Sequence, residues 1–244
     1  MDKTIDLSLV LACYNEQAVF DANVKQSIQI LESTRWDYEI IFVDDGSRDR
    51  TRELIDQVIR ENPERNLSRI FHAQNQGRGG TVSDGVRAAR GDIVGYIDID
   101  LEVHARYIPT CVLAIQNGAD IATAHRIYKF YWRGLVRWIA SHGYIALQRW
   151  LLNIPLKDSE TGFKFFRREK ILPILAEIDD ERWFWDTEVM VRSYLRGYRI
   201  EEIPCLFQRR FDKQSTVNVV GDSLDYFFKL WRFRKTVTDI RSQR

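Results

Sequence analysis

The sequence is poor in features that mark several specialised classes of protein. Its three cysteines, Cys13, Cys111 and Cys205, are far apart and lack C-x-x-C spacing, which argues against a disulfide framework or a zinc site and favours a reducing compartment. No charged-then-apolar leader opens the chain, and no apolar run reaches about eighteen residues. We therefore expect neither export nor a membrane-spanning helix.

An excess of charge of one sign is also missing. The 36 basic and 35 acidic residues leave a net charge of +1, so no overall field favours binding to nucleic acid. With 45% hydrophobic residues among 244, the chain can bury a full core as one large domain or as a domain with an appendage. We expect a globular protein in which any basic binding surface is local.

Apolar runs alternate with helical patterns along most of the chain. We predict strands over 5–12, 38–43, 69–73, 93–97, 120–126 and 203–208, and helices over 17–31, 50–61 and 105–117. Ser47 or Asp49 can cap the helix that begins near residue 50. Alternation of strands and helices at this spacing predicts an α/β protein with a parallel sheet.

Polar residues follow four of these strands. They are Tyr14-Asn15-Glu16, Asp44-Asp45, Gly77-Arg78-Gly79-Gly80 and Asp98-x-Asp100-x-Glu102. Ligands of open α/β sheets lie outside the carboxyl ends of the strands, so four such ends carrying polar groups indicate a binding site. Each motif alone has a plainer interpretation as a turn, a loosened helix start or a solvated acidic loop.

The chemistry of these motifs suits a nucleotide and a metal ion. Side chains two apart on an extended backbone share a face, so Asp98, Asp100 and Glu102 can converge on Mg²⁺ or Mn²⁺, which prefer such oxygens. The carboxylates of the Asp-Asp pair can accept hydrogen bonds from a base or ribose. The glycines let the backbone approach a ligand, and Arg78 can neutralise a phosphate.

Two later stretches combine basic and aromatic side chains. Between residues 126 and 150 there are five basic residues, many aromatics and no acidic residue. If this stretch is helical, Arg133, Arg137 and Ser141 form one stripe. The alternatives are a helix lying in a membrane interface, a basic surface helix packed on the core and, weakest, nucleic-acid binding. Residues 224–240 similarly suit an interfacial helix or a contact with a partner helix.

The order of the four strand-end motifs resembles the family-2 glycosyltransferases, which have a GT-A fold. The part after residue 120 is most similar to the dolichyl- or polyprenyl-phosphate sugar synthases. The resemblance implies a single GT-A domain over 1–216 with a mostly parallel sheet and interfacial amphipathic helices. We expect an acceptor and interface segment at about 126–152 and a basic-aromatic amphipathic helix over 217–244.

The resemblance also implies site residues. Those expected to bind the nucleotide sugar are Tyr14, Glu16, Asp44, Asp45, Gly77, Arg78 and Asp98, and the expected metal ligands are Asp98, Asp100 and Glu102. Arg126, Arg137 and Ser141 match positions that bind the acceptor phosphate, and Asp100, Asp158 and Arg210 are the expected catalytic residues. The segment from Asp158 to Lys164 resembles one that lies beside the donor sugar and acceptor.

The implied reaction is inverting transfer of a sugar from a nucleotide-diphosphate sugar to a polyprenyl monophosphate. We expect the protein to carry it out while bound peripherally to the cytoplasmic face of the membrane. It could also associate with a membrane-protein partner or form a homo-oligomer. A phosphate acceptor is already ionised near neutral pH, so positioning and charge stabilisation suffice.

Two other reactions are alternatives. A family-2 transferase acting on a sugar or protein hydroxyl would need a base such as Asp158, Asp186 or Glu188, although acidic residues also suit the first turn of a helix. A sugar nucleotidyltransferase uses a related sheet, but the sequence has no glycine-rich triphosphate loop with a lysine near its start.

Overall fold

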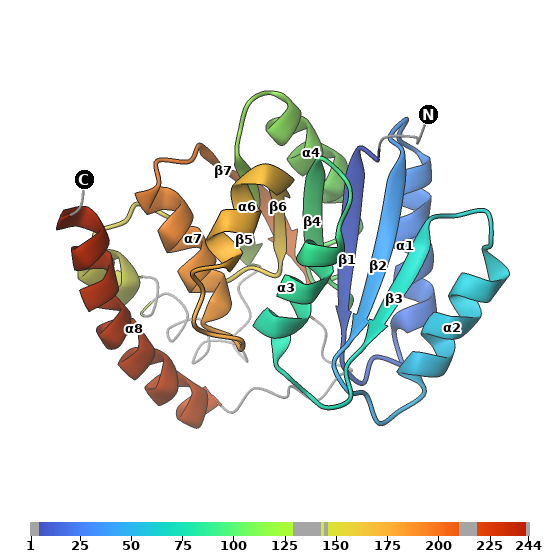
Figure 1. The fold of residues 1–244 in the computed structure, drawn as a ribbon, viewed down its shortest axis with the longest axis horizontal. Coiled ribbons are helices and arrows are strands. Elements are labelled where there is room, and N and C mark those ends of the chain that lie inside the picture. Colours follow the sequence, from blue (N-terminus) through green and yellow to red (C-terminus); the bar gives the residue numbers. More distant parts are fainter. Residues whose placement is uncertain (1–4, 129–142, 144–145, 210–218, 243–244) are drawn as a thin grey trace.

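A seven-stranded sheet organises the computed structural model, which describes residues 5–128, 143, 146–209 and 219–242 (Figure 1). The strands are β1 (Leu7–Cys13), β2 (Tyr38–Asp44), β3 (Leu67–Phe71), β4 (Ile93–Asp98), β5 (Ile121–Tyr128), β6 (Phe163–Arg167) and β7 (Ile200–Phe207). The helices are α1 (Phe20–Glu32), α2 (Thr51–Glu61), α3 (Arg78–Ala88), α4 (Ile108–Gln116), α6 (Arg168–Leu175), α7 (Trp185–Leu195) and α8 (Val219–Ser242), with a 3-10 turn over Ala105–Tyr107. A short helix also covers 146–152.

The strand order is β3-β2-β1-β4-β6-β5-β7. β1 runs parallel to β2 and β4, and β5 runs parallel to β7, whereas β6 is antiparallel to both of its neighbours. The predicted α/β class with a mostly parallel sheet is therefore confirmed. Because β6 enters the sheet from the opposite end, the loop before it lies at the edge where β4 and β5 end.

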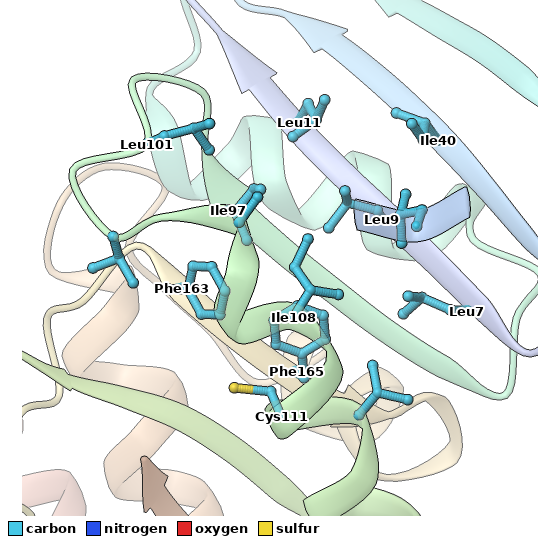
Figure 2. Packing of buried hydrophobic residues seen from close by; sticks show 14 of the residues in the cluster. Leu7, Leu9, Leu11, Ile40, Ile97, Leu101, Ile108, Cys111, Phe163 and Phe165 are labelled. Atoms are coloured by element: carbon cyan, nitrogen blue, oxygen red, sulfur yellow. The ribbon is translucent and has the colours of Figure 1, made fainter. Parts of the chain in front are cut away.

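Alternate side chains of the central strands pack into two separate cores. Leu7, Leu9 and Leu11 of β1 point to the face covered by α1, α2 and α4, where Figure 2 shows them with Ile97, Ile108, Phe163 and Phe165. Val10 points to the other face, which α3, α6, α7 and α8 cover. The period of two along a strand thus fixes the register and leaves the strand ends to carry polar groups.

The C-terminal helix α8 flanks α7, at the end of the molecule opposite α2 (Figure 1). Leu230, Phe233 and Val237 are buried at helical spacing, and Phe233 packs edge-on against Phe184. Its outer side exposes several aromatic rings. Helix 217–244 was predicted as amphipathic, and over 226–242 the buried stripe and exposed rings fit that pattern; the predicted domain boundary at residue 216 remains a prediction.

The start of α2 differs from the predicted cap. The N-cap position is Arg50, which makes no side-chain capping hydrogen bond. Asp49, one residue earlier, accepts a hydrogen bond from the backbone N–H of Thr51 at 2.9 Å, so it stabilises the turn before the helix without occupying the cap. Among the helices that the structure describes, we find none long and apolar enough to span a bilayer.

Candidate active site

The loops after β1 and β2 are tied together at the carboxyl edge of the sheet. The backbone N–H of Asn15 donates to Ser47 Oγ at 2.9 Å, and the backbone N–H of Glu16 donates to Thr51 Oγ1 at 2.8 Å. Asn15 has a positive φ of 57°, which turns the chain sharply after the strand. The half-buried Tyr14 and the buried Glu16, both predicted nucleotide contacts, therefore lie beside the predicted Asp44-Asp45 pair.

Asp44 uses one carboxylate oxygen to hold its own turn. Its Oδ2 accepts from the backbone N–H groups of Gly46 and Ser47 at 3.1 and 2.9 Å, and from Arg52 Nε at 2.8 Å. Its Oδ1 is buried, and within the described part of the chain it has no hydrogen-bond partner. A buried carboxylate oxygen without a donor is costly unless a ligand supplies one.

Asp45 instead fixes the glycine-rich turn. Its carboxylate accepts from the backbone N–H groups of Gln76 and Gly77 at 2.7 and 3.0 Å and contacts His72 Nδ1 at 3.0 Å. Gly77 has φ of 101°, and a Cβ there would lie 2.7 Å from the carbonyl oxygen of Glu181. The turn before α3 therefore requires glycine. Asp45 contributes to the site by holding this turn in place, in addition to any contact that it makes with a ligand.

Arg78, at the start of α3, is shared between two carboxylates. Its Nε and Nη2 donate to Asp98 Oδ1 at 3.0 and 2.8 Å, and its Nη1 donates to Asp186 Oδ2. Burial opposes the charge of Arg78, but Asp186 and Asp98 outweigh that effect and raise its pKa well above the ordinary value. The predicted contact of Arg78 with phosphate remains a prediction, since in this structure its partners are carboxylates.

A buried lysine completes this network. Lys164 Nζ, in the middle of β6, lies 2.5 Å from Asp186 Oδ1 and 3.0 Å from the hydroxyl of Tyr96, which itself donates to Asp186. Lys164 also donates to the carbonyl of Thr161. The Asp186 carboxylate therefore serves Arg78, Tyr96 and Lys164 together.

The backbone brings the start of β6 very close to this network. A Cβ on Gly162 would lie 1.7 Å from Asp98 Oδ2 and 2.5 Å from Arg78 Nη2. The backbone N–H of Asp98 donates to the carbonyl of Gly162 at 2.9 Å. Only glycine fits here, because any side chain would displace Asp98 and Arg78. The motif after Asp158 therefore allows the network to form.

The three predicted metal ligands lie on one tight turn. Leu101 has φ of 53°, Asp100 Oδ1 accepts from the backbone N–H of Glu102 at 3.2 Å, and the carbonyl of Glu102 accepts from the backbone N–H of Gln208 at 2.8 Å. Across the residues described, no three His, Cys, Asp or Glu side chains are gathered closely enough to hold a metal ion. The carboxylate chemistry fits Mg²⁺ or Mn²⁺, and the side chain of Asp98 is 46% exposed at this turn, although Arg78 binds its Oδ1 and Gly162 lies against its Oδ2.

A second half-buried arginine lies near the end of β5. Arg126 Nε and Nη2 donate to the two carboxylate oxygens of Asp158 at 2.7 and 2.9 Å. Burial alone would raise the pKa of Asp158, but Arg126 reverses that effect and lowers it. Glu202 Oε1, on β7, anchors the backbone N–H groups of Lys157 and Asp158 at 2.7 and 3.0 Å. Two predicted site residues, Arg126 and Asp158, are thus brought together.

Glu160 lies in the same loop and was not among the predicted site residues. Burial raises the pKa of its carboxyl to about 7, an effect that Asp158 and Asp186 increase and Arg126 and Lys164 oppose. Its Oε1 is buried with no hydrogen-bond partner among residues the structure describes. Nothing in the sequence distinguished Glu160 from an ordinary loop carboxylate.

Of the two acidic residues predicted to open α7, only Asp186 joins the site. Glu188 instead accepts from Arg192 Nε at 2.8 Å and from the backbone N–H groups of Asp179 and Asp180 at 3.1 and 3.2 Å. Three predicted residues, Arg137, Ser141 and Arg210, lie outside the described residues. Lys164 ends the segment that the resemblance places beside the donor sugar and acceptor. Its carboxylate partner was not predicted, although a lysine within an apolar run favours one.

Residues 8–174 match the family described as Glycosyl transferase family 2. The chain belongs to this family. It is therefore a glycosyltransferase, as the order of its strand-end motifs predicted.

Curated relatives support the resemblance to polyprenyl-phosphate sugar synthases. Glycosyltransferase AglD of Haloferax volcanii is 33% identical over 226 residues, which is 90% of this chain but 35% of AglD. A dolichyl-phosphate beta-glucosyltransferase of Dictyostelium discoideum is 27% identical over 97% of this chain and 74% of its own length. That of Saccharomyces cerevisiae is 28% identical over 83% of this chain and 67% of its own length. The chain thus spans about a third of AglD.

Solved structures confirm the GT-A fold. Glucosyl-3-phosphoglycerate synthase from Mycobacterium tuberculosis, in complex with UDP, superposes with a TM-score of 0.71 at 19% identity over 95% of this chain and 80% of that one. The mannosyltransferase PcManGT from Pyrobaculum calidifontis, in complex with GDP-Man and Mn²⁺, gives 0.61 at 14% identity over 99% of this chain and 74% of that one.

Proposed function

We propose that this glycosyltransferase transfers a sugar, with inversion, from a nucleotide-diphosphate sugar to a polyprenyl monophosphate. The observation that carries the proposal is that two half-buried arginines, each paired with a carboxylate, lie at one edge of the sheet: Arg78 after β3 and Arg126 near the end of β5. One suits a donor diphosphate and the other an acceptor phosphate. The names of the dolichyl-phosphate relatives support the same acceptor class.

The donor side is assigned to the loops after β1 to β4. Asp44 Oδ1, buried and lacking a donor among the described residues, can accept an N–H of the nucleotide base. Tyr14 and Glu16 lie on the neighbouring loop, and Asp45 holds the turn at Gly77, whose backbone would face the phosphates. Asp98, Asp100 and Glu102 would hold Mg²⁺ or Mn²⁺, which supplies charge stabilisation to the departing diphosphate when bound.

The acceptor side is assigned to Arg126, together with Arg137 and Ser141 of the sequence. A guanidinium has five N–H donors, and Asp158 accepts from two of those of Arg126, so donors remain for a phosphate oxygen. An ionised phosphate attacks without losing a proton, so the site needs orientation and charge more than a base. Arg210, by the family resemblance, would stabilise the leaving diphosphate.

Transfer to a hydroxyl is the competing function, and the ion pairs of its candidate bases argue against it. Asp158 is held by Arg126, Asp186 by Arg78 and Lys164, and Glu188 by Arg192, so each of the three candidate bases is already paired. Glu160 is the observation that favours this alternative, since a carboxyl with a pKa of about 7 is suited to proton transfer near neutral pH.

Peripheral membrane contact at the cytoplasmic face is part of the proposal. Phe227, Phe228 and Trp231 are 40%, 64% and 55% exposed on α8, and the exposed Arg234 lies over the Trp231 ring. Trp150, on the helix over 146–152, is 76% exposed. Aromatic rings beside basic side chains suit the interface of an anionic membrane, and such binding should weaken with salt.

The decisive experiment is a panel of nucleotide sugars assayed with a short polyprenyl phosphate and, separately, with soluble sugar and peptide hydroxyls. Transfer to the lipid phosphate supports the proposal, and transfer only to a hydroxyl overturns it. Arg126→Ala and Arg137→Ala should each lower kcat/KM for the lipid phosphate about ten- to a hundredfold, because a charge-assisted contact is lost, while donor binding stays nearly unchanged. Arg199→Ala, at an exposed position before β7, is the matched control.

A further inference from the structure

Lys164 carries a charge in a place where it cannot reach the solvent. Its side chain is 0% exposed, and the Asp186 carboxylate beside it is 2% exposed. Burying such a pair contributes little to stability, because the loss of hydration offsets most of the attraction between the charges. A methionine of similar length would fill the same space without that cost, so the lysine needs another explanation.

The contacts of Lys164 form a chain that runs from the interior to Asp98 at the edge of the sheet. Lys164 and Tyr96 bind Oδ1 of Asp186, while Arg78 binds Oδ2 of Asp186 and, with its other nitrogens, Oδ1 of Asp98. The side chain of Asp98 is 46% exposed, so the network runs from the interior to the edge where the donor loops meet. The two cations and two carboxylates balance in charge.

We propose that Lys164 is a positioning residue for the donor site: by neutralising Asp186, it keeps Arg78 directed at Oδ1 of Asp98 and so holds the Asp98 carboxylate in place for the divalent cation of the donor. This inference rests on the proposed metal-dependent donor binding. Lys164 itself lies behind the network and does not touch donor or acceptor.

The physical reason is competition between two carboxylates for one guanidinium. With Lys164 present, Asp186 is already paired, and Arg78 is attracted to both carboxylates. Without it, Asp186 would be a buried charge with Arg78 as its main partner, and the attraction would draw Arg78 away from Asp98. Asp98 would then be more exposed, less ordered and less suitable as a metal ligand.

Titration behaviour agrees with this geometry. Burial lowers the pKa of Lys164, and Asp186 partly restores it, so the charge of the lysine depends on that carboxylate. Arg78 pairs with the other oxygen of the same carboxylate, so the two cations share Asp186 and a change at Lys164 must be felt at Arg78.

The test compares Lys164→Met with Lys164→Met/Asp186→Asn, which removes one positive and one negative charge together. Binding of Mn²⁺ plus UDP or GDP is measured by calorimetry, with no acceptor present. We expect Lys164→Met to weaken Mn²⁺ binding about tenfold, as one misplaced charge-assisted contact would do, and the double variant to recover most of it. Lys164→Arg should retain binding, because it keeps the charge. Lys170→Met is the control, since Lys170 is 37% exposed and lies 4.0 Å from Asp120.

A second measurement needs neither metal nor substrate. Lys164→Met and Asp98→Asn are combined in a double-mutant cycle of the unfolding free energy, although the two side chains meet only through Arg78. Non-additive effects support the inference, and additive effects overturn it. The inference is also overturned if folded Lys164→Met binds Mn²⁺ like the wild type, or if the double variant recovers nothing. If the wild type binds no Mn²⁺ while the cycle is non-additive, the metal-dependent function fails and the positioning role of Lys164 stands.

Discussion

The two half-buried arginines of the site, Arg78 and Arg126, are paired in different ways. Arg126 makes a bidentate pair with one carboxylate, Asp158, and the two side chains are 16% and 4% exposed. Arg78 divides its nitrogens between Asp186, at 2% exposure, and Asp98, at 46%. The first is a closed pair, and the second is an open chain with one end in the solvent.

The difference decides what a ligand can change at each arginine. An anion that displaces Asp98 from Arg78 leaves Arg78 with Asp186, so no charge is stranded in the interior. Displacing Asp158 from Arg126 would strand two largely buried charges, which is costly. The contact of Arg78 with Asp98 is therefore the more easily broken one, whereas the proposed acceptor phosphate would use the remaining donors of Arg126 while Asp158 stays paired.

The largest loss of activity is expected on removing the carboxylate of Asp100, which pairs with neither Arg78 nor Arg126. Asp100→Ala should reduce transfer about a thousandfold or more, because charge stabilisation by a metal ion is worth several kcal/mol and no neighbour on that turn can replace the ligand. EDTA should have the same effect on the wild type, and circular dichroism should remain unchanged for the variant. Full activity of Asp100→Ala in chelator would contradict metal-dependent transfer.

The next effect tests the closed pair against the open chain directly. Asp158→Ala should lower the free energy of unfolding by about 3–5 kcal/mol, because it leaves Arg126 buried without its partner. Asp98→Ala should cost less than about 1 kcal/mol, since that carboxylate is half exposed and Arg78 keeps Asp186. Urea unfolding of both variants checks the comparison, and equal losses would show that the two arginines are not held differently.

The pH dependence of stability should separate two carboxyls of the same loop. Burial raises the pKa of Glu160 to about 7, so the native state binds the extra proton and stability falls as pH rises from about 4.5 to 7, by on the order of 3 kcal/mol at most. Asp158, whose pKa is lowered beside Arg126, has the opposite sign: its contribution is present above about pH 4 and is lost below.

Glu160→Gln isolates the first of these effects. The variant should gain stability at pH 7 relative to the wild type and should lose the decline between about pH 4.5 and 7. Thermal unfolding at several pH values gives the measurement. An unchanged pH profile would mean that Glu160 is solvated and is not the buried acid of this loop. The same variant, assayed with a hydroxyl acceptor, reports on whether Glu160 serves as a base there.

The sequence predicts which residues gather at the strand ends better than it predicts their partners. Asp44, Asp98 and Asp100 follow buried strands, so a rule about strand ends brings them to one edge. That rule does not predict that the carboxylate of Asp45 accepts hydrogen bonds from the backbone of the glycine-rich turn. It also cannot tell Asp186 from Glu188, because both occupy the first turn of α7 and only tertiary packing selects the partner.

The antiparallel strand β6 is the main feature of the fold that the pattern did not give. Residues 163–167 alternate poorly and carry Lys164 within an apolar run, so neither period nor polarity identifies a strand. Its direction depends on the long connection from β5, which no local signal fixes. The resemblance placed the segment from Asp158 to Lys164 beside the donor sugar and acceptor, but the contacts of Lys164 and Gly162 with Asp186, Asp98 and Arg78 required the structure.

The smallest effect is expected where α8 meets the Arg78 side. Lys229 Nζ lies 2.7 Å from Asp180 Oδ2, in the loop whose Glu181 carbonyl accepts from the backbone N–H of Gly80 at 2.8 Å. Lys229→Ala should therefore cost less than about 1 kcal/mol of stability but raise the donor KM by about two- to threefold, because the start of α3 loses support. Lys235→Ala, an exposed control on the same helix, should change neither. The acceptor KM should stay constant in both variants, since Arg126 is held by Asp158 from a different loop; a change in acceptor KM alone would mean that α8 supports the closed pair instead.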